Sequence, residues 1–561
     1  MTMAPSTAAS AADGLLASLD PEQRAAATLP DGPAIVIAPA GSGKTTTLIA
    51  RLGVLLGRGV PADRIGVVTF NRDAAAELSA RIASRLAPHV PGAEAIEVRT
   101  LHAMARQVLL DGGRPVRLAN GRLPLLRAAR RRALAELPAV AESDDPPPEP
   151  PDPSALDTIV SAWKVEGRPP PSDAASTVSA FQALMDVRGL IDFDDLVVGA
   201  VAALEADPQF RRRWQARFSH LCVDEFQDVD AAQLRLVRLL AAPQDNLFVV
   251  GDDDQTIYAW RLADVRRILG FCDEYPTARR IQLATNYRCP AALITASRRL
   301  IEVNDERFAK RIDSPPGRGG TADAIGLLDA TTPDWPERVA DLAAREAVLR
   351  SRSCVLARTR AELMQVMQAL LRAGIRHATS LATPLESAVV QALLEAAQGL
   401  PAEVEPFPAL RRIRAVRRWQ RGDGSDALGD DDHAALDAAL GWAAGFRRLD
   451  RFLDAAHAGA ARTATLRDSS APLELVTVHG AKGREWPTVI IIGWEEERFP
   501  NRRALVDAAD PARALEEERR LAYVALTRAT ERLILVLDPA RPSRFLEEMG
   551  YRPTSGATTV R

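Results

Sequence analysis

The chain has 561 residues, of which 47% are hydrophobic and 26% charged, and its formal net charge is −3. The length predicts several domains, the composition is that of a globular protein, and the small net charge excludes a uniformly basic coat for nucleic acid but not a local basic channel. No apolar run approaches the length of a membrane span, and the first residues lack the pattern of a signal peptide. We expect residues 1–18 to be a frayed tail.

The cysteines show no paired spacing of the kind that metal sites use. Three of the four lie beside or within predicted strands, which indicates buried thiols in a reducing cytoplasm. We therefore expect a cytoplasmic protein. The cysteines are Cys222, Cys272, Cys289 and Cys354.

A short helix is predicted to begin at Asp20-Pro21, with Asp20 as the N-cap and Pro21 in the first helical position. Gln23 lies on this helix, one element before the loop described next. A glutamine there can read adenine with one donor and one acceptor. Taken alone, Gln23 is better explained as a residue of the helix surface.

Residues 38–45, Ala-Pro-Ala-Gly-Ser-Gly-Lys-Thr, follow an apolar strand and precede a predicted helix. This is the context of a phosphate-binding loop, although Ala38 replaces the first glycine of the usual pattern. The glycines let backbone N–H groups surround an anion, and the helix N-terminus adds partial positive charge. Lys44 is predicted to reach the β- and γ-phosphates, and the Thr45 hydroxyl to hold Mg²⁺.

Lysine usage supports this interpretation. Lys and Arg together number 71, yet the only lysines are Lys44, Lys164, Lys310 and Lys482. A compact ammonium fits between phosphates where a planar guanidinium does not substitute. Lys44 is therefore not expected to be a casual surface charge.

Two further strands are predicted at residues 65–70 and 95–99, each running into a helix. Such alternation indicates a parallel α/β sheet, which binds ligands at the carboxyl ends of its strands. Phe70, Asn71 and Arg72 lie at one such end and His102 at the next. His102 alone is equally explained as a core or capping histidine.

Residues 111–190 are Arg-rich and helical, and are interrupted by an acidic, proline-rich stretch at 142–153. We interpret the stretch as an extended linker within a helical insertion. The following Ile191-Asp192-Phe193-Asp194-Asp195-Leu196 is interpreted as a capped helix start with acids in its first turn.

The apolar run 221–223 ends in Asp224-Glu225, which predicts the second half of a nucleotide-hydrolysis site. Asp224 would hold Mg²⁺, and Glu225 would orient and deprotonate the attacking water. The next strand, at 247–250, leads to Gln255, a candidate sensor of the γ-phosphate. The aromatic and basic residues that follow indicate base stacking and phosphate contact, although either ring taken singly is better explained as a core residue. They are Tyr258, Trp260 and Arg261.

With Asn286-Tyr287-Arg288, the combination becomes specific. The segments Asp-Glu-Phe-Gln-Asp (224–228), Gly-Asp-Asp-Asp-Gln (251–255) and Asn-Tyr-Arg (286–288) resemble those of the UvrD/Rep/PcrA family of superfamily 1 DNA helicases. Residues 475–486 look like the family's fifth motif and residues 515–529 like its sixth. The resemblance spans residues 19 to about 540.

The resemblance implies a role for each matching residue. Gln23 and Tyr287 are expected to contact adenine, Glu485 the ribose, and Arg288 and Arg528 the γ-phosphate, with Arg528 coming from the second domain. The rest of the nucleotide site is expected at Ala40, Gly41, Ser42, Gly43, Lys44, Thr45, Thr46, Asp224, Glu225 and Gln255. The single-strand path is expected at Phe70, Asn71, His102, Tyr258, Trp260 and Arg261.

The expected fold class is α/β, with two RecA-like parallel-sheet domains that each carry a helical insertion. The first domain would comprise residues 1–110 and 191–290 around an insertion at 111–190. The second would comprise residues 291–400 and 471–545 around a short insertion at 401–470, with a tail at 546–561. The Arg-rich residues 411–419 of that insertion are equally explained as a duplex-binding face or as a solvated helix.

The expected activity is Mg²⁺- and ATP-dependent translocation on single-stranded DNA with 3′–5′ helicase activity, in DNA repair or recombination. Expected partners are single strands, single/double-strand junctions and DNA repair or replication proteins, but no membrane. The short second insertion leaves open a translocase that strips proteins from DNA and unwinds little. A non-hydrolysing scaffold subunit is the alternative outside enzymes, and the intact Lys44, Asp224 and Glu225 argue against it.

Overall fold

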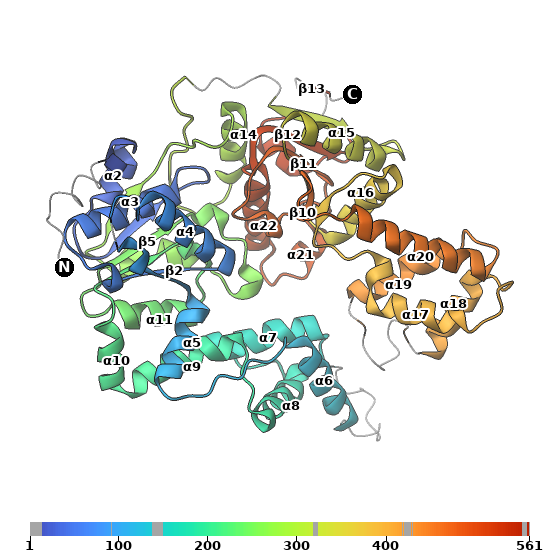
Figure 1. Cartoon of the computed structure of the whole chain (residues 1–561), viewed down its shortest axis with the longest axis horizontal. Coiled ribbons are helices and arrows are strands. Elements are labelled where there is room, and N and C mark those ends of the chain that lie inside the picture. The colour runs from blue at the N-terminus through green and yellow to red at the C-terminus, as the bar shows by residue number, and fades with distance from the viewer. Residues whose placement is uncertain are drawn as a thin grey trace. The chain divides into compact units, whose positions relative to one another are not determined.

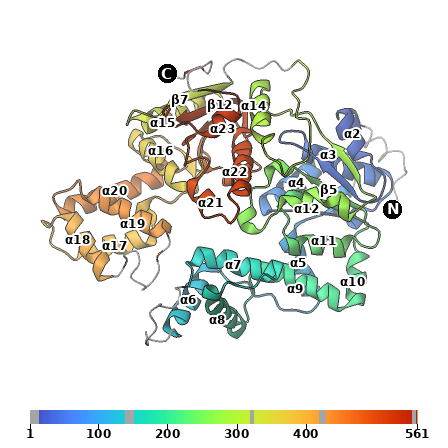
Figure 2. The ribbon, with the colours of Figure 1, turned by 180° about the vertical axis from the view of Figure 1, so that it is seen from behind.

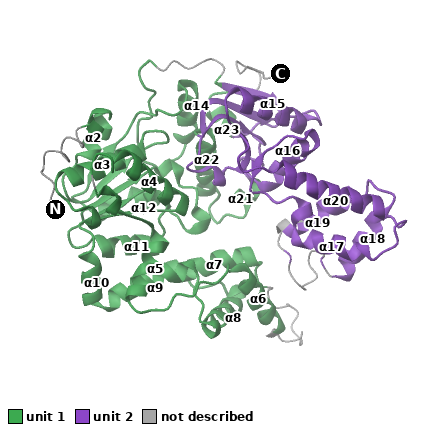
Figure 3. Cartoon of the chain, viewed as in Figure 1, with its two compact units in different colours: residues 1–324, 502–527, 545–551 green, residues 325–501, 528–544, 552–561 purple. Residues whose placement is uncertain are grey.

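The computed structural model describes residues 14–90, 92–136, 150–317, 324–417, 419, 428, 430–552 and 558–559. Residues 1–13 of the expected tail, 142–149 of the expected linker and Arg418 lie outside the described residues. The chain forms two compact units (Figure 3). Unit 1 comprises Met1–Ala324, Arg502–Thr527 and Phe545–Tyr551, and unit 2 comprises Ile325–Asn501, Arg528–Arg544 and Arg552–Arg561.

Unit 1 is built on a six-stranded parallel sheet with the order β3-β2-β4-β5-β1-β6. Along β1, Ile35 and Ile37 pack into one hydrophobic core while Ala34 and Val36 pack into another. Burial on both faces is what a parallel sheet covered by helices on both sides requires. The strands are β1 (Ala34–Ile37), β2 (Ile65–Thr69), β3 (Glu97–Thr100), β4 (His220–Val223), β5 (Leu247–Gly251) and β6 (Arg279–Gln282).

Helices cover both faces of this sheet (Figure 1). Leu48 of α3 and Leu78 of α4 belong to the core on one face. Met104 of α5, Val201 of α9 and Leu236 of α11 belong to the core on the other. The helices of this part are α2 (Pro21–Ala27), α3 (Lys44–Gly57), α4 (Arg72–Arg85), α5 (Leu101–Asp111), α9 (Phe193–Ala206), α10 (Pro208–Gln215), α11 (Ala231–Ala241), α12 (Val265–Leu269), α13 (Phe271–Glu274) and α14 (Ala291–Ile301).

The first insertion has a core of its own. Leu126, Val160 and Phe181 are buried together, one from each of three helices. In both views this group extends beyond α5 and α9 (Figures 1 and 2). Its helices are α6 (Leu123–Glu136), α7 (Pro153–Glu166) and α8 (Ser172–Arg188).

Unit 2 contains a seven-stranded parallel sheet with the order β13-β7-β12-β11-β8-β10-β9. The α/β class with two parallel sheets, expected from the sequence, is confirmed. The strands are β7 (Ile325–Asp329), β8 (Ser353–Ala357), β9 (Ala378–Thr379), β10 (Leu473–Thr477), β11 (Trp486–Ile491), β12 (Ala529–Leu537) and β13 (Thr558–Thr559).

Helices α15 and α16 pack on this sheet through a core that includes Val339, Leu363 and Val355. Four further helices form a separate core around Leu393, Leu436 and Phe452. The helices of unit 2 are α15 (Trp335–Leu349), α16 (Arg360–Ala373), α17 (Ala388–Gln398), α18 (Pro406–Val416), α19 (Asp430–Ala443) and α20 (Leu449–Leu466). On α18, Arg411 and Arg412 are exposed.

Three helices come late in the chain: α21 (Arg502–Val506), α22 (Pro511–Leu526) and α23 (Arg544–Glu548). Helix α22 packs against α14 and against the short helix η4 (Asp253–Gln255), and is grouped with unit 1 for that reason. The sequence-based boundaries put residues 291–317 and 502–527 in the second domain, and those boundaries stay a prediction. Among the described helices, none has the length and apolarity needed to cross a membrane.

Candidate functional site

The loop between β1 and α3 is shaped by two glycines with left-handed backbones. Gly41 has φ 72° and Gly43 has φ 82°. A Cβ on Gly41 would lie 2.5 Å from Asn286 Oδ1, and one on Gly43 would lie 2.5 Å from Gln23 Nε2. At Gly41 only glycine fits both the dihedral angle and the space, whereas at Gly43 the left-handed φ is the main requirement, because the close atom is the end of a flexible side chain. Helix α3 starts at Lys44 with no side-chain cap, so its first N–H groups are left for an anion.

Two carboxylates lie at the end of β4, beside this loop. Lys44 Nζ is 3.6 Å from Glu225 Oε1. The N–H of Asp224 donates to the carbonyl of Val68 at 2.9 Å, which extends the sheet pairing and fixes the acid at the strand end. Glu225 adopts φ 52°, a strained conformation for a non-glycine residue that is typical of functional sites.

Burial and the neighbouring Glu225 charge raise the pKa of Asp224 to about 7, while Lys44 acts in the opposite direction. A divalent cation would favour the ionised form, so this donor set fits Mg²⁺. In the described part of the chain, no group of three or more His, Cys, Asp or Glu side chains is arranged to hold a metal. In nucleotide sites, Mg²⁺ is commonly bound by one or two carboxylates together with phosphate oxygens and water.

Gln227 connects the acidic pair to the next strand end. Its Nε2 donates to Glu225 Oε2, and its Oε1 accepts from the N–H of Asp252 at 3.0 Å. Asp252 Oδ2 in turn accepts from Gln255 Nε2 at 2.7 Å. Hydrogen bonds thus run from Glu225, the ion-pair partner of Lys44, to the expected γ-phosphate sensor. No role for Gln227 is predicted from the sequence. The feature that could have indicated one is its position two residues after Asp224-Glu225, at the end of a strand.

The two residues expected to contact adenine, Tyr287 and Gln23, bind the loop between β1 and α3 through the carbonyls of Gly41 and Ser42. The N–H of Tyr287 donates to the carbonyl of Gly41 at 2.9 Å, and its hydroxyl donates to Asp20 Oδ2 at 2.8 Å. Gln23 Nε2 donates to the carbonyl of Ser42 at 2.9 Å, and its Oε1 accepts from the N–H of Asp20 in a capping box. The Asp20 N-cap expected from the sequence is confirmed. The Gln23 amide is engaged within the protein at both ends.

The two expected arginines have different surroundings. Arg288 Nη1 donates to the carbonyl of Thr527 at 3.3 Å, within unit 1. Arg528 belongs to unit 2, where Trp486 N–H donates to its carbonyl at 3.0 Å and its Nη1 donates to the carbonyl of Arg484 at 3.2 Å. Glu485, the expected ribose contact, is exposed in unit 2.

A row of aromatic rings begins at the end of β2. The ring of Phe70 stacks on Tyr258 with centroids 4.9 Å apart and planes 19° apart. Tyr258 meets Trp260 edge-on at 6.2 Å, and the Arg261 guanidinium lies 4.6 Å from the centre of the Trp260 ring. Trp260 is 53% exposed, so a ring face is available to a nucleobase. Asn71 caps α4 by accepting from Ala74 N–H at 2.8 Å.

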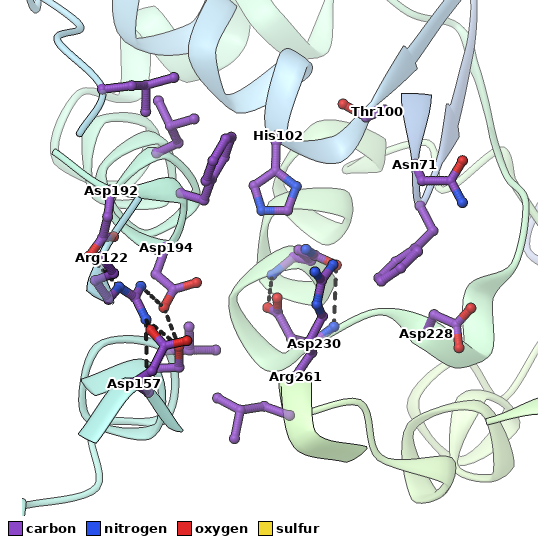
Figure 4. A pocket seen from close by; sticks show the side chains of 18 of the residues that line it. Asn71, Thr100, His102, Arg122, Asp157, Asp192, Asp194, Asp228, Asp230 and Arg261 are labelled. Atoms are coloured by element: carbon purple, nitrogen blue, oxygen red, sulfur yellow. Dashed lines mark hydrogen bonds and ion pairs between the residues drawn. The ribbon is translucent and has the colours of Figure 1, made fainter. Parts of the chain in front are cut away.

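The row borders a cavity of about 640 Å³ in unit 1. Figure 4 shows His102 pointing into the cavity, with Arg261 on one side of it. On the other side lie Arg122 and its acidic partners, which are described below. Burial lowers the pKa of His102, the Asp194 charge opposes this, and Arg261 adds to it. His102 also meets the edge of the Phe193 ring at 5.6 Å.

On the opposite side of the cavity, Arg122 binds three aspartates that also line it. It donates to Asp157 Oδ1 and to Asp192 Oδ2, both at 3.0 Å, and it pairs with Asp194. Asp192 caps α9, as the sequence predicts, so Arg122 joins the first insertion to the start of that helix. Phe193, which is 50% exposed, is presented by the same turn. The sequence offered Phe193 only as part of a capped helix start, and Arg122 only as one arginine among many.

Comparisons with known proteins identify the family of the chain. The UvrD/REP helicase N-terminal domain matches residues 19–276, and the UvrD-like helicase C-terminal domain matches residues 445–538. The chain is 30% identical to the ATP-dependent DNA helicase UvrD2 of Mycobacterium tuberculosis, over 98% of this chain and 84% of the relative.

Two other relatives have similar coverage. The chain is 28% identical to the ATP-dependent DNA helicase PcrA of Leuconostoc citreum, over 94% of this chain and 84% of that protein. It is 28% identical to DNA helicase II of Salmonella typhimurium, over 95% of this chain and 88% of that protein. The resemblance inferred from the motifs is confirmed. The chain belongs to the UvrD-like family of ATP-dependent DNA helicases.

Proposed function

We propose that this helicase couples hydrolysis of Mg²⁺-ATP to 3′–5′ movement along single-stranded DNA and opens duplexes at single/double-strand junctions, in DNA repair or recombination. The observation that carries the proposal is the connection from Lys44 to Gln255: an ion pair joins Lys44 to Glu225, and hydrogen bonds run from Glu225 through Gln227 and Asp252 to Gln255. It joins the phosphate loop to the segment that leads directly into the aromatic row. A nucleotide-dependent change at Gln255 therefore has a short route to the DNA-facing rings.

The phosphate site would work as follows. The backbone of Ala40, Gly41, Ser42 and Gly43, with the first turn of α3 including Thr46, would surround the phosphates, and Lys44 would neutralise their charge. Thr45 and Asp224 would hold Mg²⁺, which when bound supplies charge neutralisation to the phosphates.

Glu225 is the candidate general base, because it lies next to Lys44 and its carboxylate is oriented by Gln227. Gln255 would position the attacked phosphate group. Arg288 and Arg528 would stabilise charge that develops in the transition state, a role worth on the order of 10³–10⁵ in rate. Tyr287, which is 42% exposed, would stack on adenine, with Gln23 and Glu485 as the further base and ribose contacts.

The DNA site would use stacking and would therefore tolerate any base sequence. Phe70, Tyr258 and Trp260 supply the rings, and Arg261, Asn71 and His102 supply polar contacts. Because His102 has a lowered pKa, it would act as a neutral donor or acceptor rather than as a fixed charge.

Unwinding assays on partial duplexes test direction and junction use. We expect ATP-dependent opening of a duplex with a 3′ single-stranded tail and little opening with a 5′ tail. The reverse preference would refute the proposed direction. Rapid ATP hydrolysis on single strands without opening of either substrate would favour the protein-displacing translocase, which the short second insertion suggests.

A further inference from the structure

Residues 304–310, here called the strap, follow α14 and contact three consecutive aspartates. Lys310 Nζ lies 2.7 Å from Asp252 Oδ1, 2.5 Å from Asp253 Oδ1 and 2.9 Å from Asp254 Oδ2. The Lys310 side chain is 1% exposed and the three carboxylates are 0% exposed. A single ammonium group thus lies among three buried carboxylates.

The strap makes two further contacts with the same acids. Arg307 donates to Asp254 through Nε at 3.0 Å and through Nη2 at 2.9 Å. The N–H of Phe308 donates to Asp253 Oδ2 at 2.9 Å. Removal of one partner from such a buried set leaves an uncompensated charge, which is strongly unfavourable. The position of the strap is therefore tied to the conformation of residues 252–254.

The identity of residue 310 is informative. An ammonium carries three donors on a compact head, which matches three carboxylates converging on one point, whereas a planar guanidinium favours one bidentate partner. This chain uses lysine at four positions only, and Lys310 is one of them. The geometry therefore favours lysine over arginine at this position.

Asp252 transmits this contact to the nucleotide site. Its Oδ1 accepts from Lys310 and its Oδ2 accepts from Gln255 Nε2 at 2.7 Å. Its N–H is fixed by Gln227 at 3.0 Å. With both carboxylate oxygens assigned, the Asp252 side chain has one favourable orientation, and that orientation sets the direction of the Gln255 amide.

The other end of the strap contacts α22. Asn304 Nδ2 donates to the carbonyl of Glu516 at 2.9 Å, and the N–H of Asp305 donates to Glu516 Oε1 at 2.8 Å. Arg520 Nη2 donates to the carbonyl of Glu306 at 2.7 Å. Helix α22 ends at Leu526 and is followed at once by Thr527 and Arg528 in the sequence.

We propose that the strap is a coupling element of the ATPase: Lys310 is a positioning residue for Gln255, and the strap links the Gln255 loop to α22, the helix that precedes Arg528. The inference rests on the proposed function, because it assumes that Gln255 responds to the γ-phosphate. In this arrangement, a shift of residues 252–255 displaces Lys310 and Arg307, and with them the strap. The contacts of the strap with Glu516 and Arg520 then transmit this displacement to α22.

Steady-state ATPase kinetics of Lys310 variants test the positioning role. For Lys310→Met, we expect the DNA-stimulated kcat to fall 10- to 100-fold, with KM for ATP within threefold of wild type and DNA affinity without nucleotide within twofold. Adding Asp253→Asn removes the excess negative charge and is expected to restore kcat at least fivefold. Arg311→Met is the matched control, since that neighbouring side chain is 73% exposed.

A second variant tests the link between the strap and α22. This test can be made even if Lys310→Met fails to fold. Glu516→Ala removes the side-chain acceptor for Asp305. We expect DNA-independent ATP hydrolysis within twofold of wild type and at least a fivefold smaller increase on adding single-stranded DNA. Wild-type kinetics in either Lys310→Met or Glu516→Ala would overturn the inference. A wild-type protein whose ATPase ignores DNA would instead refute the proposed function.

Discussion

Lys44 Nζ lies 3.6 Å from Glu225 Oε1, and this pair joins the start of α3 to the end of β4. The distance is longer than a hydrogen bond, so the two groups form a loose ion pair. Glu225 would be the carboxylate next to the attacking water, held by Gln227.

Glu225→Gln keeps the size of the side chain and removes its basicity. We expect kcat for ATP hydrolysis to fall by about 10²–10⁴, the usual contribution of a general base. The affinity for ATP should remain within threefold of wild type, because Lys44 and the loop backbone are unchanged. Single-turnover hydrolysis and binding of a fluorescent ATP analogue measure the two effects separately. A kcat within twofold of wild type would exclude Glu225 as the base.

Gly43→Ala tests the shape of the phosphate loop. The new Cβ would lie 2.5 Å from Gln23 Nε2, at a residue with φ 82°. We expect at least a tenfold loss of ATP affinity and a stability cost of about 1–3 kcal/mol. Gly59→Ala is the control, since Gly59 has φ 86° at the end of α3 with nothing within 4 Å. Gly59→Ala should lose stability through its left-handed backbone alone and should keep wild-type ATP affinity. Equal ATP affinities in Gly43→Ala and Gly59→Ala would contradict the role of Gly43 in the phosphate loop.

Trp260→Ala removes the most exposed ring of the aromatic row. We expect single-stranded DNA binding to weaken by about 1–3 kcal/mol, the range for loss of one base–aromatic stack. DNA-independent ATP hydrolysis should be unchanged. Phe407→Ala, at a 37% exposed aromatic on α18, is the control and should bind a short single strand normally. Fluorescence anisotropy with an oligonucleotide gives both affinities, and an unchanged affinity in Trp260→Ala would remove that ring from the DNA path.

His479 gives unit 2 a pH dependence. Burial, with the positive charges of Arg358 and Lys482, lowers the pKa of His479 to about 4. Between pH 6.5 and 4 the unfolded chain therefore takes up a proton that the folded chain does not, and the free energy of unfolding falls as pH falls. At pH 5 this effect is about 1–2 kcal/mol after allowance for partial exposure.

Urea unfolding at pH 7.5 and pH 5 measures this effect. His479→Gln should lose less stability than wild type over that interval. The variant His89→Gln, at an exposed histidine in unit 1, is the control and should follow wild type. Equal pH dependence in wild type and His479→Gln would contradict the assignment.

Much of the nucleotide site could be predicted from the sequence, because its residues lie at the ends of strongly apolar strands. Ile35–Ile37, residues 221–223 and residues 247–250 are unmistakable strands, and a parallel sheet brings their carboxyl ends together. Strand β6 (Arg279–Gln282) was not anticipated, because its edge position leaves Arg279 and Arg280 exposed and hides the apolar pattern.

The contacts that hold the site could not be predicted from the sequence. Lys310 is 55 residues from Gln255 in the sequence, and the contact between the strap and α22 spans more than 200 residues. Local patterns carry no signal for such pairs. The rarity of lysine indicates that Lys310 is unusual, but it does not indicate its partners. Phe193 lies between Asp192 and Asp194, so the pattern predicts a helix cap and gives no reason to expect an exposed ring beside the cavity.

The most direct test of the central claim is the rate of ATP hydrolysis with and without single-stranded DNA, in wild type and in Lys44→Ala. We expect strong stimulation of the wild type by DNA and no hydrolysis in the variant, because Lys44 is the cation of the phosphate loop. Equal rates with and without DNA would contradict coupling between the two sites. No hydrolysis by the wild type with Mg²⁺ and DNA would contradict the motor itself and favour a scaffold role.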